Sequence, residues 1–308
     1  MRTVVILNPA SAGGRTGARF NALEPAFREV LGAYELLRTQ ASGDARRFAE
    51  QAVRAGPCRI VAVGGDGTNQ EVAGGMIDLD AGRAIEPEAS FGFVAMGTGG
   101  DLGRTFGVPT EPVAALRRMA NTPARPMDAM RVETVDAQGR PLRRVAINVV
   151  SMGLGGFACY LVERRPKFGT TLPFYLAGLE SLARSAPWPV RLHTDAGEEA
   201  LRARYVVVAN ARYNGGGMLV GREAEVDDGL LDVVTVGPIG KIAMVGLTPR
   251  FYDGTFVDHP ACATRRTAKL EVRPESGSRP LFVEADGEVV GFGPATITAL
   301  PGVLRIHA

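Results

Sequence analysis

Residues Val61 to Gly75 read Val-Ala-Val-Gly-Gly-Asp-Gly-Thr-Asn-Gln-Glu-Val-Ala-Gly-Gly. The apolar run that begins at Ile60 is short and rich in β-branched residues, and Gly64-Gly65 ends it at once. Such a run predicts a strand that is buried on both faces in a parallel sheet. Thr68 can then cap a helix from about Asn69 to Ile77, so the glycines would lie between a strand and a helix N-terminus.

This junction suits a phosphate group. The backbone N–H groups of a helix N-terminus bind anions, and Gly64, Gly65 and Gly67 would permit positive φ angles and a close approach of ligand to backbone. Asp66 would be a carboxylate beside that phosphate, which makes sense when a cation or a transferring proton lies between them. The spacing is neither G-x-G-x-x-G nor that of a P-loop. A tight structural turn is the alternative interpretation of the glycine pair.

Length and composition indicate a globular protein of one large or two ordinary domains, with 308 residues and 45% hydrophobic side chains. The net charge of +2, from 35 basic and 33 acidic residues, gives no basic excess, so a nucleic-acid partner is not expected. Cys58, Cys159 and Cys262 lie far apart in the chain. This pattern suits a reducing compartment, and we expect all three to be packing residues.

Two segments have some features of export or membrane signals. Thr3 to Leu7 is apolar but too short for a signal peptide, and Asn8-Pro9 ends it, so a first strand is expected. Val145 to Val162 is long enough to suggest a transmembrane helix, but it contains several glycines and many β-branched residues. We interpret it as a strand and a loop, and we predict no membrane span.

The first third of the chain alternates strand and helix patterns. Between the helical patterns, apolar runs predict the strands Thr3–Leu7, Tyr34–Arg38, Ile60–Val63 and Phe91–Ala95. This order implies right-handed crossovers and a doubly wound, mostly parallel α/β sheet, with ligands at the carboxyl ends of the strands. Residues 8–17, Thr39 and the Gly64 turn would meet at that edge, as a nucleotide site requires.

From Met127 onward, strands separated by glycine- or charge-bearing turns predict an antiparallel β-sandwich or open barrel. The expected strands are Ala129–Val135, Arg143–Val150, Val190–Thr194, Arg204–Ala209, Leu230–Val236, Ala268–Arg273, Ala295–Leu300 and Val303–His307.

The string Gly-Gly-Asp-Gly-Thr resembles the signature of the diacylglycerol kinase catalytic-domain family, the soluble lipid kinases that include the sphingosine kinases. NAD kinases share its Gly-Gly-Asp-Gly core. The resemblance implies a kinase that uses ATP with Mg²⁺. It further implies a phosphate cradle that consists of Gly64, Gly65, Asp66, Gly67, Thr68, Asn69 and Gln70.

The first loop resembles the family's Asn-Pro-x-Ser-Gly motif with a departure. Asn8 begins Asn-Pro-Ala-Ser-Ala, so Ala12 replaces the usual glycine. Arg15 stands where a lysine is common and keeps a basic contact to phosphate. The alternative for Asn8-Pro9 is a simple turn.

Residues 96–102 resemble the family's Gly-Thr-Gly-Asn-Asp loop, because Thr98 and Asp101 match and Gly100 replaces the usual asparagine. Asp128, just after the linker, matches a family aspartate. By this resemblance it would complete a charge network with Asp101 and the aspartate of the glycine turn, near the nucleotide magnesium. An ordinary turn residue is the alternative for Asp128.

Residues 210–232 resemble a pattern of lipid kinases that NAD kinases lack, a triple-glycine turn followed by Asp-Gly-Leu-Leu-Asp-Val. By this resemblance, the Asp228 side chain and backbone carbonyls near Glu225 and Leu230 would hold a structural Mg²⁺ or Ca²⁺, ions that prefer oxygen ligands. The alternative is an Asp-Gly hairpin turn.

The segment Val283 to Glu288 ends in Asp-Gly-Glu, which as local structure predicts a strand and a turn. As a match to the family's Asp-Gly-Glu, it implies that Glu288 is the general base for the acceptor hydroxyl, with Asp66 as the other catalytic residue. The family's C-terminus returns to the nucleotide domain. The implied domains are therefore 1–126 with 290–308, for ATP, and 127–289, for the acceptor.

The resemblance implies in-line transfer of the ATP γ-phosphoryl group to the hydroxyl of diacylglycerol or a related lipid. The sequence does not say which lipid. Two alternatives stay open. One is a kinase of a soluble acceptor such as NAD. The other is a relative that binds nucleotide or lipid with weak turnover, an alternative that stays open because Ala12 and Gly100 depart from the family motifs. A cytoplasmic, peripherally membrane-associated enzyme is expected, and a homodimer is left open.

A membrane-facing surface is one further expectation. Arg164, Arg165 and Lys167 precede Phe168 and an apolar run that contains Leu172, Phe174, Tyr175 and Leu176. A basic and apolar face of this kind would suit an anionic bilayer. An ordinary amphipathic helix is the alternative.

Overall fold

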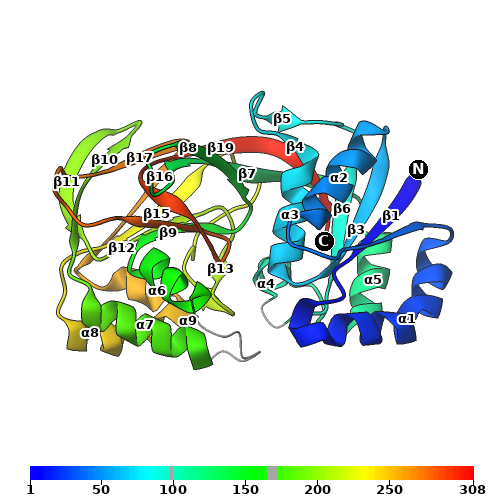
Figure 1. Ribbon diagram of the computed structural model, residues 1–308, viewed down its shortest axis with the longest axis horizontal. Coiled ribbons are helices and arrows are strands. Elements are labelled where there is room, and N and C mark those ends of the chain that lie inside the picture. Colours follow the sequence, from blue (N-terminus) through cyan, green and yellow to red (C-terminus); the bar gives the residue numbers. More distant parts are fainter. Residues whose placement is uncertain (98–99, 165–171) are drawn as a thin grey trace. The chain divides into compact units, whose positions relative to one another are not determined.

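The computed structural model describes residues 1–97, 100–164 and 172–308 (Figure 1). The chain divides into two compact units, which are Met1–Ala129 with Leu300–Ala308 and Met130–Ala299. We call them the first and the second unit. The sequence placed the corresponding divisions after residues 126 and 289. Two strands, β7 (Arg125–Val135) and β19 (Glu288–His307), contribute residues to both units.

The first unit contains the parallel sheet that the sequence predicts. Its order is β2-β1-β3-β6, and the end of β19 pairs with β6. The registers Leu7↔Arg38, Leu7↔Val63 and Gly64↔Ala95 bring the carboxyl ends of neighbouring strands level with one another. The strand bounds are β1 Arg2–Leu7, β2 Glu35–Arg38, β3 Cys58–Gly64 and β6 Ser90–Ala95.

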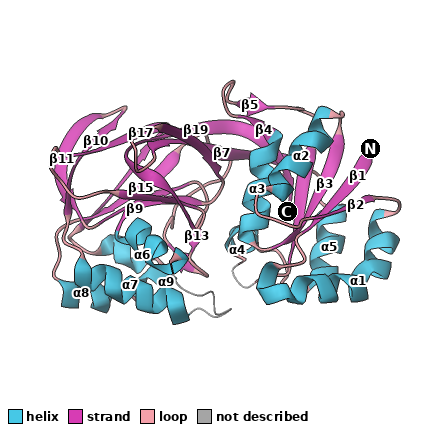
Figure 2. Ribbon diagram, viewed as in Figure 1, coloured by secondary structure: helices cyan, strands magenta, loops and turns pink. Residues whose placement is uncertain are grey.

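Helices cover both faces of this sheet (Figure 2). On one face, α1 and α5 pack over a core that includes Phe20, Phe27, Val61 and Leu116. On the other face, α2 and α3 pack against each other and against β1 and β3. The bounds are η1 Ser11–Gly14, α1 Arg15–Leu31, α2 Asp44–Arg54, α3 Asp66–Met76, β4 Ile77–Asp78, β5 Arg83–Ala84, α4 Asp101–Phe106 and α5 Pro112–Asn121.

The second unit is the antiparallel sandwich-like domain that the sequence predicts. One core, around Trp188 and Val190, is formed by residues of strands that belong to one continuous sheet, among them β9, β10, β12, β15 and β17. A second core, around Phe251 and Phe256, lies between the strands β9, β12 and β15 and the helices. The strands are β8 Pro141–Ala146, β9 Val149–Gly153, β10 Trp188–Thr194, β11 Gly197–Ala203, β12 Tyr205–Ala209, β13 Tyr213–Asn214, β14 Met218–Leu219, β15 Leu231–Val236, β16 Cys262–Thr267, β17 Lys269–Pro274 and β18 Phe282–Ala285.

The sequence missed most helices of the second unit. They are α6 Leu154–Glu163, α7 Leu172–Arg184, α8 Lys241–Leu247, α9 Arg250–Asp253 and η2 Thr255–Asp258. The interpretation of Val145–Val162 as strand and loop was wrong, because α6 begins directly after β9. The glycines of α6 serve close packing, since a Cβ on Gly156 would lie 2.3 Å from the carbonyl oxygen of Phe282. The two strands expected at 295–307 are one strand, β19.

Three further features of the fold concern the cysteines, a helix cap and the lengths of the helices. Cys58, Cys159 and Cys262 carry free thiols, of which the first two are buried, in agreement with a packing role. Glu111 caps α5, because its side chain accepts hydrogen bonds from the N–H groups of Val113 and Ala114. Among the helices of the described residues, none has the length and apolar character that a bilayer crossing requires.

Candidate functional site

The glycine turn joins β3 to α3 at the carboxyl edge of the parallel sheet. Gly64 and Gly65 do not adopt positive φ angles, so the expected conformational reason for them was wrong. Gly64 and Gly97 are required by lack of space, whereas a Cβ on Gly65 itself would lie 3.6 Å from the Cα of Gly97, an ordinary contact. A Cβ on Gly64 would lie 2.3 Å from Thr68 Oγ1, and a Cβ on Gly97 would lie 2.7 Å from the Cα of Gly65. Gly67 differs, because it is exposed and no atom lies within 4 Å of the Cβ position.

Thr68 does not cap the helix as predicted. Helix α3 begins at Asp66, Gly65 is its N-cap, and no side chain caps it. Thr68 is buried in the first turn, where its Oγ1 accepts a hydrogen bond from Asn8 Nδ2 at 3.1 Å. Asn8 Oδ1 in turn accepts the N–H of Ala10 at 3.1 Å. These contacts fix the first loop against the glycine turn.

Asp66 holds the loop that follows β6. Its Oδ2 accepts the N–H groups of Gly100 at 2.7 Å and Asp101 at 3.1 Å, and its Oδ1 accepts that of Leu102 at 3.4 Å. These are N–H groups at the start of α4, where a negative charge is favourable. Gly100 has φ +74°, a left-handed conformation that glycine and asparagine both tolerate. Thr98 lies outside the described residues.

The other two predicted aspartates have partners of their own. Asp101 is buried, and its Oδ1 pairs with Arg104 Nη1 at 3.0 Å. Asp128 is only 1% exposed, and its Oδ1 accepts the N–H of Gly302 at 2.6 Å, which fastens the returning end of β19. In the described part of the chain, no group of three or more histidine, cysteine, aspartate or glutamate side chains is arranged to hold a metal ion.

The first loop takes a left-handed turn at Ala12, with φ 54° and ψ 33°. The exposed Arg15 donates from Nε to the Ala12 carbonyl at 2.9 Å. The sequence missed Thr16, which is buried, shares a 2.5 Å hydrogen bond with Ser11 Oγ and lies 3.3 Å from the Met96 carbonyl. The sequence did offer a signal for Thr16, because this threonine lies in the first turn of a helix, directly after a glycine-rich loop.

The second loop of this edge follows β2. Thr39 is buried, and its N–H donates to the Leu7 carbonyl at 2.9 Å. Glu71 of α3, also missed, accepts the N–H groups of Gly43 at 2.9 Å and Ala45 at 3.1 Å. The glycine turn and α3 are therefore bound to the loops after β1, β2 and β6. Asn69 is buried in α3 and Gln70 is partly buried there.

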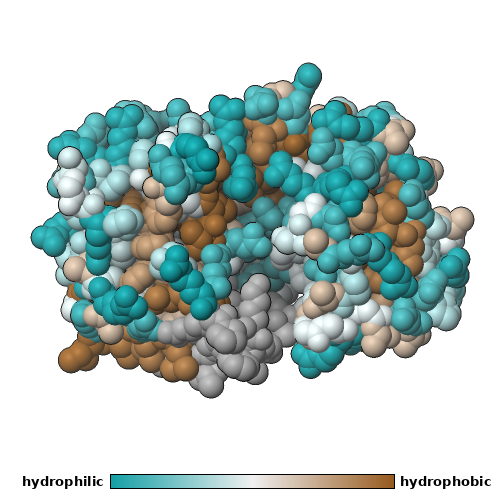
Figure 3. Space-filling model, in the orientation of Figure 1, coloured by the Kyte–Doolittle hydropathy of each residue, from teal (hydrophilic) through white to brown (hydrophobic). Residues whose placement is uncertain are grey.

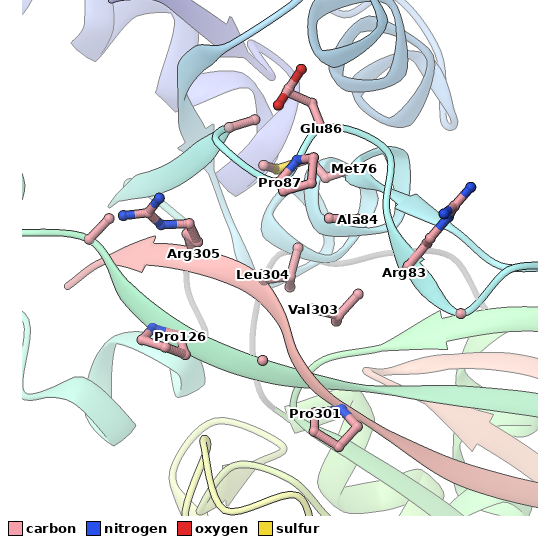
Figure 4. Close-up of a pocket in the computed structure, with 14 residues that line it drawn as sticks. Met76, Arg83, Ala84, Glu86, Pro87, Pro126, Pro301, Val303, Leu304 and Arg305 are labelled. Carbon is pink, nitrogen blue, oxygen red and sulfur yellow. The ribbon is translucent and has the colours of Figure 1, made fainter.

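A hollow of about 490 Å³ lies elsewhere in the first unit, beside the β4–β5 hairpin (Figure 4). Met76, Arg83, Glu86 and Arg305 are among its lining residues. Ala89, which directly precedes β6, also lines it, so it lies at the amino end of that strand. None of the residues predicted to contact the nucleotide lines this hollow.

In the second unit, Glu288 begins β19 after a two-residue turn and is exposed. Asp286 and Gly287 form this turn with φ angles of 49° and 92°. The Asp286 carboxylate accepts the N–H groups of Ile147, Asn148 and Val149 at 2.7 to 3.0 Å. The turn that carries Glu288 is therefore bound to the start of β9.

A buried carboxyl group, which the sequence did not single out, supports the same turn. Glu284 is 3% exposed, accepts Ser151 Oγ at 2.5 Å and accepts the Gly287 N–H at 2.6 Å. Burial raises the pKa of Glu284 to about 7, although both hydrogen bonds act in the opposite direction. Burial also raises the pKa of the neighbouring Cys159 thiol, whose Sγ donates to the Gly287 carbonyl at 2.8 Å. In the sequence, the only signal of a buried carboxyl group here was the glutamate of Val-Glu-Ala, which occupies an inward-facing position of a predicted strand.

The predicted metal ligands lie in the loop before β15. Leu230 donates its N–H to Asp228 Oδ1 at 2.9 Å, as in an Asp-Gly turn, and Gly229 has φ +74°. The other Asp228 oxygen pairs with Arg266. Asp232 is buried nearby, and burial together with Glu223 and Glu225 raises its pKa to about 6.

Two family models match the chain. Residues 2–132 match the family described as "Diacylglycerol kinase catalytic domain". Residues 148–308, more than half of the chain, match the family described as "YegS C-terminal NAD kinase beta sandwich-like domain".

Curated relatives agree with these matches. A protein of Xanthomonas oryzae pv. oryzae (strain MAFF 311018), named "Probable lipid kinase YegS-like", is 31% identical over 276 residues, covering 87% of this chain and 84% of that protein. A protein of the same name from Pseudomonas aeruginosa (strain PAO1) is 30% identical over 307 residues, covering 99% and 94%. A crystal structure described as "a putative diacylglycerol kinase from Bacillus anthracis str. Sterne" has a TM-score of 0.77 at 21% identity, covering 99% of this chain and 96% of that chain, which shows the shared fold.

Proposed function

Because the chain belongs to the diacylglycerol kinase catalytic-domain family, we propose that it transfers the γ-phosphoryl group of ATP to the hydroxyl group of diacylglycerol or a related lipid. One observation carries the proposal. The loops after β1, β2 and β6 are hydrogen-bonded to the glycine turn and α3 at the carboxyl edge of the parallel sheet. Nucleotides bind at this edge in such sheets.

The phosphates would lie against the start of α3. Gly67 leaves open space there, and the backbone N–H groups of a helix N-terminus attract anions. Arg15 on the first loop would add a positive charge. Asn8, Thr39, Asn69, Gln70 and Thr98 complete the proposed nucleotide contacts.

Magnesium would be bound with the nucleotide and would neutralise charge on the transferred phosphoryl group. Asp66 offers carboxylate oxygens, which suit this ion. Asp101, whose Oδ1 pairs with Arg104 at 3.0 Å, would act on the ion through bound water. Asp66 also binds three N–H groups of the loop after β6, so it would position that loop around the nucleotide. Asp128 is nearly inaccessible and bound to Gly302, which suits a positioning role rather than direct contact.

Glu288 would accept the proton of the acceptor hydroxyl as it attacks the phosphorus. A general base must reach that proton first, and its pKa matters second. The exposed position of Glu288 permits such reach. Asp286 and Glu284 hold the turn that carries it, so the carboxylate would keep its place through the reaction.

The assay for this proposal uses labelled ATP with magnesium, a panel of dispersed lipids and NAD. Label in one lipid product would support the proposal and identify the acceptor. Label in the NAD product would instead indicate a kinase of a soluble acceptor. Nucleotide binding without transfer to any acceptor would indicate a relative that has lost turnover.

We also propose peripheral contact with a membrane through the helices of the second unit. The segment on which the sequence argument rested lies mostly outside the described residues. Helix α8 supplies an independent reason: Ile242 is 91% exposed, and Val245 beside it and Leu176 of α7 are also exposed. Figure 3 shows apolar atoms at the lower left edge, where Figure 1 places α7 and α8.

Sedimentation with vesicles tests this contact. Ile242→Asp should reduce binding to vesicles of phosphatidylglycerol and phosphatidylcholine by about 10- to 150-fold, because a buried aliphatic side chain contributes roughly 1.5 to 3 kcal/mol. Ala196→Asp, in the exposed turn between β10 and β11, is the matched control and should bind as the wild type does. Equal binding by both variants would exclude α8 as the contact.

A further inference from the structure

The acidic loop before β15, residues 224–232, lies next to a positively charged side chain of the same chain, Arg266. Strands β15 and β16 pair antiparallel, and their register places Arg266 directly opposite Asp232. Side chains at directly opposed positions of an antiparallel pair lie about 4.5 to 5.5 Å apart at Cβ. The position of Arg266 is therefore fixed by the sheet.

Arg266 contacts two carboxylates at once. Its Nη2 forms a hydrogen-bonded ion pair with Asp228 Oδ2, and its Nε lies 3.5 Å from Asp232 Oδ2. Within the described residues, no hydrogen bond reaches that Asp232 oxygen, so the Arg266 guanidinium meets it by charge alone. Arg212, whose Nε donates to the Ala224 carbonyl at 3.3 Å, adds a second positive charge that acts on the Asp232 carboxyl. The side chains of Asp228 and Asp232 are 19% and 12% exposed, so solvent screens these pairs only in part.

These contacts do not fit the structural ion that the family resemblance implies. That ion would be coordinated by the Asp228 side chain and by backbone carbonyls near Glu225 and Leu230. One Asp228 oxygen already accepts the Leu230 N–H, and Arg266 binds the other. Mg²⁺ and Ca²⁺ need at least six oxygen ligands, and a guanidinium next to the carboxylate would repel them.

We infer that Arg266 supplies the positive charge of this loop, so that residues 224–232 hold their conformation without a divalent metal. An arginine suits this role because it is always protonated and its planar fork can bridge two carboxylates. The inference concerns the second unit alone and does not depend on which acceptor the enzyme uses.

Thermal unfolding of the full chain without nucleotide tests the inference. The melting temperature of the wild type should be the same in EDTA, in Mg²⁺ and in Ca²⁺. Arg266→Met should lower it by about 2 to 4 °C, the shift expected for loss of a partly buried ion pair in a unit of this size. Ca²⁺ or Mg²⁺ should recover part of that loss, because the carboxylates would then be open to a cation.

Arg265→Met is the matched control. Arg265 is the neighbour of Arg266 on the same strand, and its Nη1 pairs with Glu199 Oε2 at 2.5 Å. Its loss removes one positive charge and one ion pair but leaves Asp228 and Asp232 with Arg266. Metal should therefore not stabilise this variant.

Two results would overturn the inference. The first is a wild-type melting temperature that falls in EDTA, rises again with Mg²⁺ or Ca²⁺, and loses this response in Asp228→Asn. The second is an Arg266→Met variant that has the melting temperature of the wild type, both with and without Mg²⁺ or Ca²⁺. If Arg266→Met does not fold, Arg266→Lys replaces it, because lysine keeps the charge without the planar fork. This variant should fold, melt below the wild type and show no response to metal. Failure of the kinase proposal would leave all these results unchanged, since no nucleotide is present.

Discussion

The glycine turn of the first unit and the Asp286–Gly287 turn of the second need glycine for different reasons. Gly64 has ordinary backbone angles but no room, because a Cβ would lie 2.3 Å from Thr68 Oγ1. Gly287 has ample room but a φ of 92°, which side chains rarely tolerate. Glycine is therefore required by packing at Gly64 in the first turn and by backbone conformation at Gly287 in the second.

The two turns also differ in the group that they present. The first turn presents the backbone at the start of α3, with Asp66 bound to three N–H groups of the neighbouring loop. The second presents a side chain, Glu288, while Asp286 and Glu284 bind backbone N–H groups beneath it. We expect the first turn to determine nucleotide affinity and the second to determine the rate of transfer.

The largest expected effect follows from this division. Glu288→Gln keeps the size of the side chain but removes the base, so kcat should fall by about 10²- to 10⁴-fold with nucleotide affinity nearly unchanged. Asp66→Asn should weaken nucleotide binding as well as the rate. Steady-state kinetics on the lipid identified by the panel and calorimetry with nucleotide measure both. If Glu288→Gln retains most of the wild-type kcat, the assignment of the base is wrong.

The packing requirement of the first turn predicts a large loss of stability. Gly64→Ala should lower the free energy of unfolding by about 3 kcal/mol, because the added methyl group has to displace Thr68. Gly67→Ala, three residues later, meets no atom and should cost nothing in stability. Urea unfolding of both variants measures the difference. Equal stability of the two would show that lack of space is not the reason for the first glycine.

The buried carboxyl group under the second turn predicts a pH dependence. The pKa of Glu284 is raised from 4.5 to about 7, so the folded state holds its proton more tightly than the unfolded state does. Stability should therefore decrease as pH rises from about 4.5 to about 7, by roughly 2 to 3 kcal/mol. Glu284→Gln should lack this decrease. Urea unfolding at pH 5 and pH 8 compares them, and parallel profiles would contradict the prediction.

The smallest expected effect concerns the left-handed turn at Ala12. An L-residue in this conformation costs about 1 to 2 kcal/mol, and the greater flexibility of glycine in the unfolded chain offsets part of that. Ala12→Gly should therefore stabilise the protein by about 0.5 kcal/mol. Ala18→Gly, at an exposed position inside α1, is the control and should destabilise it by about 1 kcal/mol. A loss of stability in Ala12→Gly would contradict the argument from strain.

The sequence by itself determined the parallel sheet, the antiparallel second unit and the candidate motifs, because strand and helix periodicity and short glycine-rich strings are local properties. It predicted β3 and β6 close to their observed bounds. It failed at α6, because the glycines of this helix pack closely against other segments, and a glycine-containing stretch in the sequence is typical of a loop.

Only the tertiary structure decided which groups bind one another. Thr68 pairs with Asn8, Glu284 with Ser151, and Arg266 with Asp228, each across 38 or more positions of the chain. No local pattern encodes such pairs, because they arise when strands and loops from distant parts of the chain reach the same edge of a sheet. The sequence could not show whether a glycine is required by packing or by conformation, because the space around a Cβ depends on residues that only the fold brings close.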